Sequence, residues 1–255
     1  DISATSQMLT YAAEFLAIQH EVHVVTSRLS YEGGDIFTAN DFIDRVVVQR
    51  VWSTNFGRVN LLGRTIDYLT FWVSVFFNLL ILLKRGDTVI AKTDPPLVSI
   101  AVGAAARIRG ARHVNWLQDI FPEVAVELGM QIPGFVVSIL TWLRNRSLLQ
   151  ADQNIVIGEL MRNRVLMQGV ANDNTRVVPN WADGTSITPR ATANPLREKW
   201  QLEGKFVVGY SGNLGQAHEI ETLFGAIRQL SSDPSVVFLF IGGGALLDEL
   251  KTRLG

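Results

Sequence analysis

The clearest chemical pattern in the chain is a glycine-bearing turn between a strand and a helix, far along the sequence. Gly212, Asn213, Leu214 and Gly215 follow the apolar run Val207–Tyr210 and precede a helical pattern. Backbone N–H groups at the start of a helix are unpaired and carry the positive end of the helix dipole, and glycines let a ligand approach them. The turn therefore predicts a cradle for phosphate groups. The alternative is a turn that serves only the close packing of strand on helix.

A second candidate is a carboxylate in the first half of the chain. Asp119 follows the apolar run His113–Leu117. The carboxyl end of a parallel strand faces the crevice where ligands bind, so this side chain can orient a hydroxyl or accept a proton. The alternative is a cap for the next helix, with Pro122 in its first turn. Asp94, which directly follows the run Thr88–Lys92 and Thr93, has a similar placement.

A parallel sheet is needed to hold these residues, and the chain has the pattern of one. Short β-branched runs alternate with helical stretches, which is typical of parallel strands joined by crossover helices. The late position of the glycine turn, after a long stretch of this alternation, indicates two Rossmann-like folds in tandem. The runs are Val22–Thr26, Arg45–Val51, Thr88–Lys92, His113–Leu117, Asn154–Ile157, Arg176–Val178, Phe206–Tyr210 and Val236–Ile241.

The domain boundary is expected where this alternation stops. Pro179–Gly184 and the polar, proline-bearing segment after it have the composition of a linker. We predict a first domain over residues 1–183 and a second over 184–255. The chain opens directly on a helical pattern and stops one helix after Gly242–Gly244. We therefore expect a first strand to be missing and the second domain to be incomplete.

Composition narrows the class of protein. The chain has 255 residues, of which 47% are hydrophobic, enough for one large core and part of another. A formal net charge of −1 gives no general attraction for nucleic acid, so we expect none as a partner. The absence of cysteine removes disulfides, thiolate metal sites and cysteine nucleophiles, and it fits a cytoplasmic protein.

Two hydrophobic stretches raise the question of a membrane. Tyr68–Leu83 is uncharged over 16 residues, which is short of the roughly 20 that cross a bilayer. It is either a crossover helix packed on the sheet or a membrane-facing patch. Phe135–Leu149 contains Trp142 beside Arg144 and Arg146, a mixture that suits an anionic membrane surface and equally an ordinary surface helix.

Four segments together resemble the glycosyltransferase family 4 enzymes of bacterial surface-polysaccharide synthesis, in particular the colanic-acid and O-antigen enzymes of the WbuB and WcaI type. The resemblance implies the GT-B architecture, an α/β fold of two Rossmann-like domains with parallel sheets. It also implies a retaining hexosyltransferase that takes a nucleotide sugar as substrate and needs neither a metal ion nor another cofactor. The segments are Thr93–Leu97, Trp116–Glu123, Val178–Asp183 and Gly209–Gly215.

The resemblance gives these residues roles. The first domain would bind the acceptor, a saccharide expected to be linked to polyprenyl diphosphate, at the inner face of the cytoplasmic membrane. Asp119 stands where many members carry a catalytic-site histidine. The Gly212–Gly215 turn would hold the donor diphosphate, together with His218 in place of the arginine and lysine of better-known members; His218 is otherwise a structural or exposed histidine. The family's paired glutamates would lie beyond Gly255, so the fragment is expected to be inactive alone.

Two other functions remain open on the same architecture. A non-hydrolysing sugar-nucleotide epimerase would need several acid and base groups around the cleft, including histidines, and the chain has four histidines. A non-catalytic partner subunit would explain why the usual arginine and lysine are absent after Gly212.

Overall fold

The fold is described from a computed structural model, for residues 4–30, 36–57, 61–185, 187–189, 194–215, 219–244 and 246–254. The chain divides into two compact units, Asp1–Ala182 and Asp183–Gly255. His218 lies outside the described residues, so its contact with phosphate stays a prediction.

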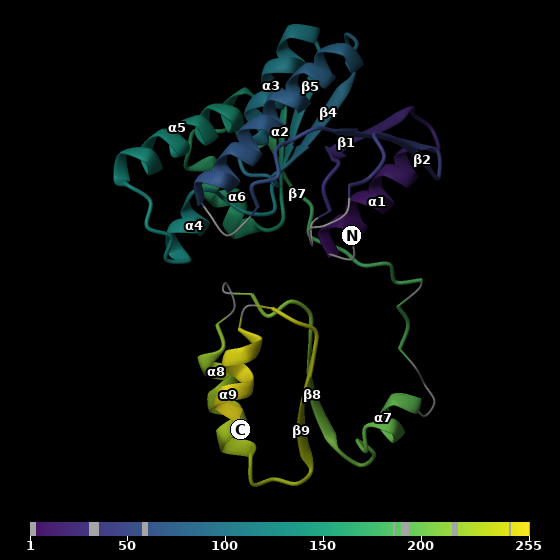
Figure 1. Cartoon of the computed structure of the whole chain (residues 1–255), viewed down its shortest axis with the longest axis vertical. Helices are drawn as coiled ribbons and strands as arrows, with labels where there is room; N and C mark the ends of the chain where they lie inside the picture. Colours follow the sequence, from purple (N-terminus) through teal and green to yellow (C-terminus); the bar gives the residue numbers. More distant parts are fainter. Residues whose placement is uncertain are drawn as a thin grey trace. The chain divides into compact units, whose positions relative to one another are not determined.

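The first unit is a layered α/β fold in which helices and strands alternate (Figure 1). Seven of its helical segments, the 3₁₀ helix included, and seven strands fall within the described residues. In chain order they are α1 (Ala4–Leu16), β1 (Val22–Ser27), β2 (Asn40–Ile43), β3 (Val46–Val51), α2 (Leu61–Leu82), β4 (Thr88–Lys92), α3 (Val98–Arg109), β5 (Arg112–Trp116), α4 (Glu123–Glu127), α5 (Gly134–Gln150), β6 (Gln153–Val156), α6 (Glu159–Leu166), the 3₁₀ helix η1 (Asn172–Asn174) and β7 (Thr175–Val177).

The strands pair largely as the alternation predicts. Four of them form a parallel sheet in the order β4-β5-β6-β7, and β1 pairs with β3 in parallel. The sequence pattern missed β2, which pairs antiparallel with β3. Its residues Asn40–Ile43 are all exposed, and they lack the β-branched run by which the other strands were found.

Helices cover both sides of the β1–β3 strand pair. α1 packs through Ala13 on Val46 and Val48, whereas α2 packs through Val75 and Leu79 in a core that includes Val51. Because successive side chains of a strand point to opposite faces, α1 and α2 lie on opposite sides. α3 contacts α2 and also α5, so these three helices form one layer across the strands (Figure 1).

The second unit contains one strand–helix–strand arrangement and two further helices. α7 (Pro195–Lys199) is followed by β8 (Phe206–Ser211), α8 (Glu221–Leu230), β9 (Val236–Ile241) and α9 (Leu247–Leu254). β8 and β9 are parallel, in agreement with the predicted unit. Leu214, Ile220, Phe224 and Leu250 form its buried core, so the glycine turn is fixed through the Leu214 side chain.

Candidate active site

The loops after β4 and β5 lie side by side at the carboxyl edge of the four-stranded sheet of the first unit. Ala91 pairs with Asn115 and Lys92 with Trp116 in parallel register, which brings the residues that follow each strand to the same place. The Gln118 backbone N–H donates to the Thr93 hydroxyl oxygen over 3.2 Å. This hydrogen bond joins the two loops that carry Asp94 and Asp119.

A pocket opens between these loops and α2. Its lining mixes positive, negative and neutral polar groups, which suits a polar, charged ligand. On the α2 side the Arg64 Nε donates to the Tyr68 hydroxyl oxygen over 2.7 Å, so the guanidinium is held with one nitrogen engaged. The lining residues are Arg64, Tyr68, Lys92, Thr93, Asp94, Pro96, Gln118 and Asp119.

Asp119 has the electrostatics of a proton acceptor. Burial raises its pKa above the ordinary value, the negative charge of Asp94 acts in the same direction, and an interaction with the Thr93 hydroxyl opposes both. A raised pKa makes an ionised carboxylate a stronger base. Asp119 does not cap the next helix: the N-cap of α4 is Pro122, and among the described residues no side chain caps it.

The pocket also contains a half-buried amine. Burial lowers the pKa of Lys92, while the carboxylate of Asp94 raises it and so reduces the shift. Two carboxyls and two cations therefore share one small space. Within the described residues, no three His, Asp or Glu side chains gather as metal ligands.

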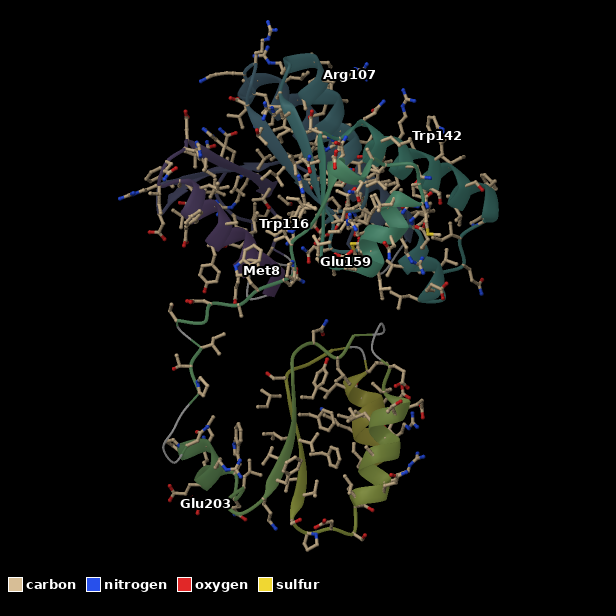
Figure 2. All side chains as sticks on the ribbon, turned by 180° about the vertical axis from the view of Figure 1, so that it is seen from behind. Met8, Arg107, Trp116, Trp142, Glu159 and Glu203 are labelled. Atoms are coloured by element: carbon tan, nitrogen blue, oxygen red, sulfur yellow. The ribbon has the colours of Figure 1, made fainter. Side chains whose placement is uncertain are left out.

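Contacts on both sides of Asp119 in the sequence fix the chain that carries it. On α5, Arg144 is buried and forms an ion pair with Glu123 over 2.5 Å, at the start of α4. At the end of β5, Trp116 stacks on Trp181 with 5.8 Å between ring centroids. The Trp181 backbone N–H donates to the sulfur of Met8 over 3.3 Å, and Figure 2 shows Met8 and Trp116 close together.

The predicted phosphate cradle in the second unit is packed against a second glycine turn. Gly212 and Gly242 have positive φ angles of 148° and 135°, and a Cβ on Gly242 would clash with the carbonyl oxygen of Gly212. Three backbone N–H groups of the first turn are already hydrogen-bonded to carbonyl oxygens. These bonds are Gly212 to Ile241, Leu214 to Gly243 and Gly215 to Asn213, over 2.9, 2.6 and 2.9 Å.

A carboxylate occupies the start of the helix that follows. The Glu219 side chain accepts hydrogen bonds from the backbone N–H of Glu221 over 2.8 Å and of Thr222 over 3.2 Å. Hydrogen bonding by the Thr222 side chain, and then by the backbone N–H groups of Thr222 and Glu221, lowers the pKa of Glu219, which keeps it ionised. A phosphate that used the first turn of α8 would have to displace this carboxylate.

The sequence predicted some residues of the pocket in the first unit and of the glycine turn in the second, and missed others. Reasoning from the sequence found Asp94 and Asp119, and the structure brings both into one pocket. It missed Arg64 and Tyr68, whose i,i+4 spacing on a helix was the available signal. It also missed the capping role of Glu219. Donor binding by Gly212, Asn213, Leu214 and Gly215 stays a prediction.

The fold is that of a GT-B glycosyltransferase. Anabaena Alr3699/HepE, solved in complex with UDP-glucose, is similar with a TM-score of 0.57 and 19% sequence identity, over 83% of this chain and 52% of that one. The α/β fold class with parallel sheets that the sequence predicts is confirmed.

The family of glycosyl transferase 4-like domains matches residues 4–181, and the chain belongs to this family. It is 27% identical over 259 residues to WcaI of Escherichia coli (strain K12), provisionally named a colanic acid biosynthesis glycosyl transferase, covering 95% of this chain and 63% of WcaI. It is 32% identical over 173 residues to WbjE of Pseudomonas aeruginosa, provisionally named a glycosyltransferase, covering 66% of this chain and 42% of WbjE. The chain thus spans less than two thirds of either relative.

Proposed function

We propose that the protein transfers a sugar from a nucleotide sugar to a saccharide linked to polyprenyl diphosphate, in the synthesis of a bacterial surface polysaccharide. The observation that carries this proposal is the pocket of Arg64, Lys92 and Asp119, which lies within the residues that match the glycosyltransferase family. The complex of HepE with UDP-glucose supports a nucleotide-sugar donor. The name of WcaI supports a role in exopolysaccharide synthesis.

The pocket suits the acceptor part of this reaction. Arg64 and Lys92 supply positive charge for the diphosphate that links the acceptor to its lipid. Asp119, whose pKa is raised by burial, receives the hydrogen bond and then the proton of the acceptor hydroxyl as the new glycosidic bond forms. The lipid places the reaction at the inner face of the cytoplasmic membrane.

The second unit suits the donor part. In this proposal the donor diphosphate lies against the adjoining glycine turns that follow β8 and β9, where backbone dipoles stabilise the charge of the leaving nucleotide. Transfer of a hexose then proceeds with retention of the anomeric configuration, because the acceptor attacks from the side that the diphosphate leaves. No metal ion or further cofactor takes part.

The test uses the full-length protein with a panel of nucleotide sugars and prenyl-diphosphate saccharides. We expect one pair to release nucleoside diphosphate, and Asp119→Asn to reduce that rate strongly. Asp173→Asn is the matched control, since Asp173 is exposed in η1, just before the start of β7, and does not line the pocket. Nucleotide binding without release for any pair would instead favour a non-catalytic partner subunit.

The distribution of histidines does not favour an epimerase. Of the histidines that the structure describes, His23 pairs with Glu21 over 2.9 Å near the start of β1, and His20 precedes the same strand. His113 is buried in β5. None of the three lines the pocket, so they cannot supply the acid and base groups that an epimerase needs there.

A further inference from the structure

One side of α2 is apolar and exposed along the helix. Its side chains are 44% to 85% exposed and repeat every three or four residues, a spacing that puts them on one face. They are Ile66, Leu69, Val73, Phe77 and Ile81, and we call them the α2 stripe. The opposite side of the helix is buried in the core through Val75 and Leu79, and so is Leu83, the residue that directly follows the helix.

The packing of α2 in the core favours a helix that lies on a membrane surface over one that crosses the bilayer. Among the described residues, Leu62–Leu82 is one helical stretch long and apolar enough to span a bilayer. Its inner side, however, packs on α3 and on the core beside β3. Insertion across the bilayer would carry strands with polar backbone edges into lipid, which is costly. A helix that is half buried in protein can instead rest flat at the interface and bury only its outer side.

The charges around the stripe suit an anionic surface. The only acid within α2, Asp67, is turned toward the preceding segment, where it accepts hydrogen bonds from the Thr54 hydroxyl over 2.6 Å and from the Phe56 backbone N–H over 3.0 Å. Exposed Lys84 and Arg85 follow the last turn of α2.

The neighbouring helices of the same layer add cations. Arg107 on α3 is exposed, and on α5 the guanidinium of Arg146 lies 5.8 Å from the ring centroid of Trp142. Figure 2 shows Arg107 and Trp142 at the outside of the first unit. Basic residues and tryptophan on the helices of the layer that also carries an exposed apolar stripe are typical of a protein that binds anionic lipid.

We propose that the α2 stripe is the surface through which the protein docks on an anionic bilayer. The inference rests on the proposed function, because a lipid-linked acceptor is held at such a surface. Arg64 and Tyr68 line the pocket from α2 itself, so docking places the pocket about one helix diameter, roughly 10–12 Å, from the lipid head groups. That is a reach that suits a short saccharide on a membrane-embedded carrier.

Vesicle flotation tests this surface without any substrate. The protein is mixed with vesicles of equal parts phosphatidylcholine and phosphatidylglycerol, and with vesicles of phosphatidylcholine alone. The variant Phe77→Ser/Ile81→Ser removes one phenylalanine and one isoleucine from the stripe. Its matched control, Phe15→Ser/Ile18→Ser, removes the same two residue types, 74% and 62% exposed, at the end of α1 on the opposite side of the sheet.

We expect the unaltered protein to float with the anionic vesicles and much less with the neutral ones. The α2 variant should lose at least about tenfold in vesicle binding, and the α1 control should stay within about twofold. Equal binding by both variants, with unchanged circular dichroism, would overturn the proposal. Sedimentation provides a second check. If the unaltered protein proves to be a dimer and the α2 variant becomes a monomer that still floats, the stripe joins two copies and the proposal is overturned.

The outcome is separable from that of the transferase assay. Flotation that depends on the α2 stripe, in a protein that transfers no sugar, would leave the docking surface in place and remove the proposed function. Transfer to a lipid-linked acceptor at an unchanged rate, by a Phe77→Ser/Ile81→Ser variant that also floats normally, would support the proposed function and remove the docking surface.

Discussion

Acidification should destabilise the first unit through one buried histidine. His113 is 4% exposed in β5, and a Cβ placed on Gly103 of α3 would lie 2.9 Å from its Nδ1 atom, so the ring is packed against that helix. Burial lowers the pKa of His113 from 6.5 to about 4, against the opposing effects of Asp152 and Asn115. The folded protein therefore holds this imidazole neutral in a pH range where the unfolded chain protonates it.

The sign and size of the effect follow from the two pKa values. Between pH 6.5 and pH 4 the unfolded state binds more protons, so the free energy of unfolding falls as the pH falls. The stabilisation present above pH 6.5 is lost as the pH approaches 4. The two pKa values differ by about 2.5, and at 1.36 kcal/mol per pKa unit this gives a total of about 3 kcal/mol, of which about 2 kcal/mol is lost between pH 7 and pH 4.5.

Urea unfolding followed by tryptophan fluorescence measures this loss, since five of the six tryptophans lie in the first unit. The comparison is between the unaltered protein and His113→Leu, at pH 7 and pH 4.5. The variant replaces the titrating group by an apolar side chain of similar size, so it should lose about 2 kcal/mol less on acidification. Equal losses in both proteins would refute the argument from burial.

Three further predictions follow from the site and its supports. Gly242→Ala should destabilise the second unit by about 2 kcal/mol or more, because the positive φ of Gly242 and the nearby carbonyl of Gly212 leave no room for a Cβ. Hydrogen exchange of the β8 and β9 amides measures this loss. The control Gly225→Ala in α8 should be tolerated, since nothing lies near its Cβ position. Arg144→Met should lower the free energy of unfolding by about 2–3 kcal/mol in urea, less than the loss of a fully buried ion pair because Glu123 is partly exposed. The double variant Arg144→Met/Glu123→Leu should recover part of this loss, because it leaves no unpaired carboxylate. Asp119→Asn should lower kcat/KM by about 10²–10⁴. In the unaltered protein, kcat/KM should fall at acid pH with a midpoint above the ordinary aspartate pKa, and the variant should lose this fall. If the variant keeps it, another group is responsible.

The sequence predicted the strands whose residues are β-branched. The run Thr88–Lys92 coincides with β4, and Val236–Ile241 coincides with β9. These strands are built from side chains that favour a pleated, half-buried surface, so local pattern and tertiary position agree. β2 has no such pattern. It exists because the antiparallel partner β3 supplies its hydrogen bonds, a long-range effect that a single segment does not reveal.

The candidate site was predictable only in part for a similar reason. Asp119 could be placed because it directly follows a strand, and the carboxyl ends of parallel strands meet at one edge. Arg64 reaches the same pocket from α2, and only the packing of that helix brings it there. In the second unit, Glu219 folds back onto the first turn of α8. Its side-chain direction decides which backbone N–H groups a phosphate can reach, and the sequence does not specify it.

The most direct measurement of the central claim is transfer of a labelled sugar from a nucleotide sugar to a prenyl-diphosphate saccharide by the full-length protein. The product is extracted into organic solvent and its anomeric configuration is determined by NMR. We predict labelled lipid, with the configuration of the donor retained, and little label with Asp119→Asn. Label that never enters the lipid fraction, from a protein that binds the nucleotide, would contradict the account.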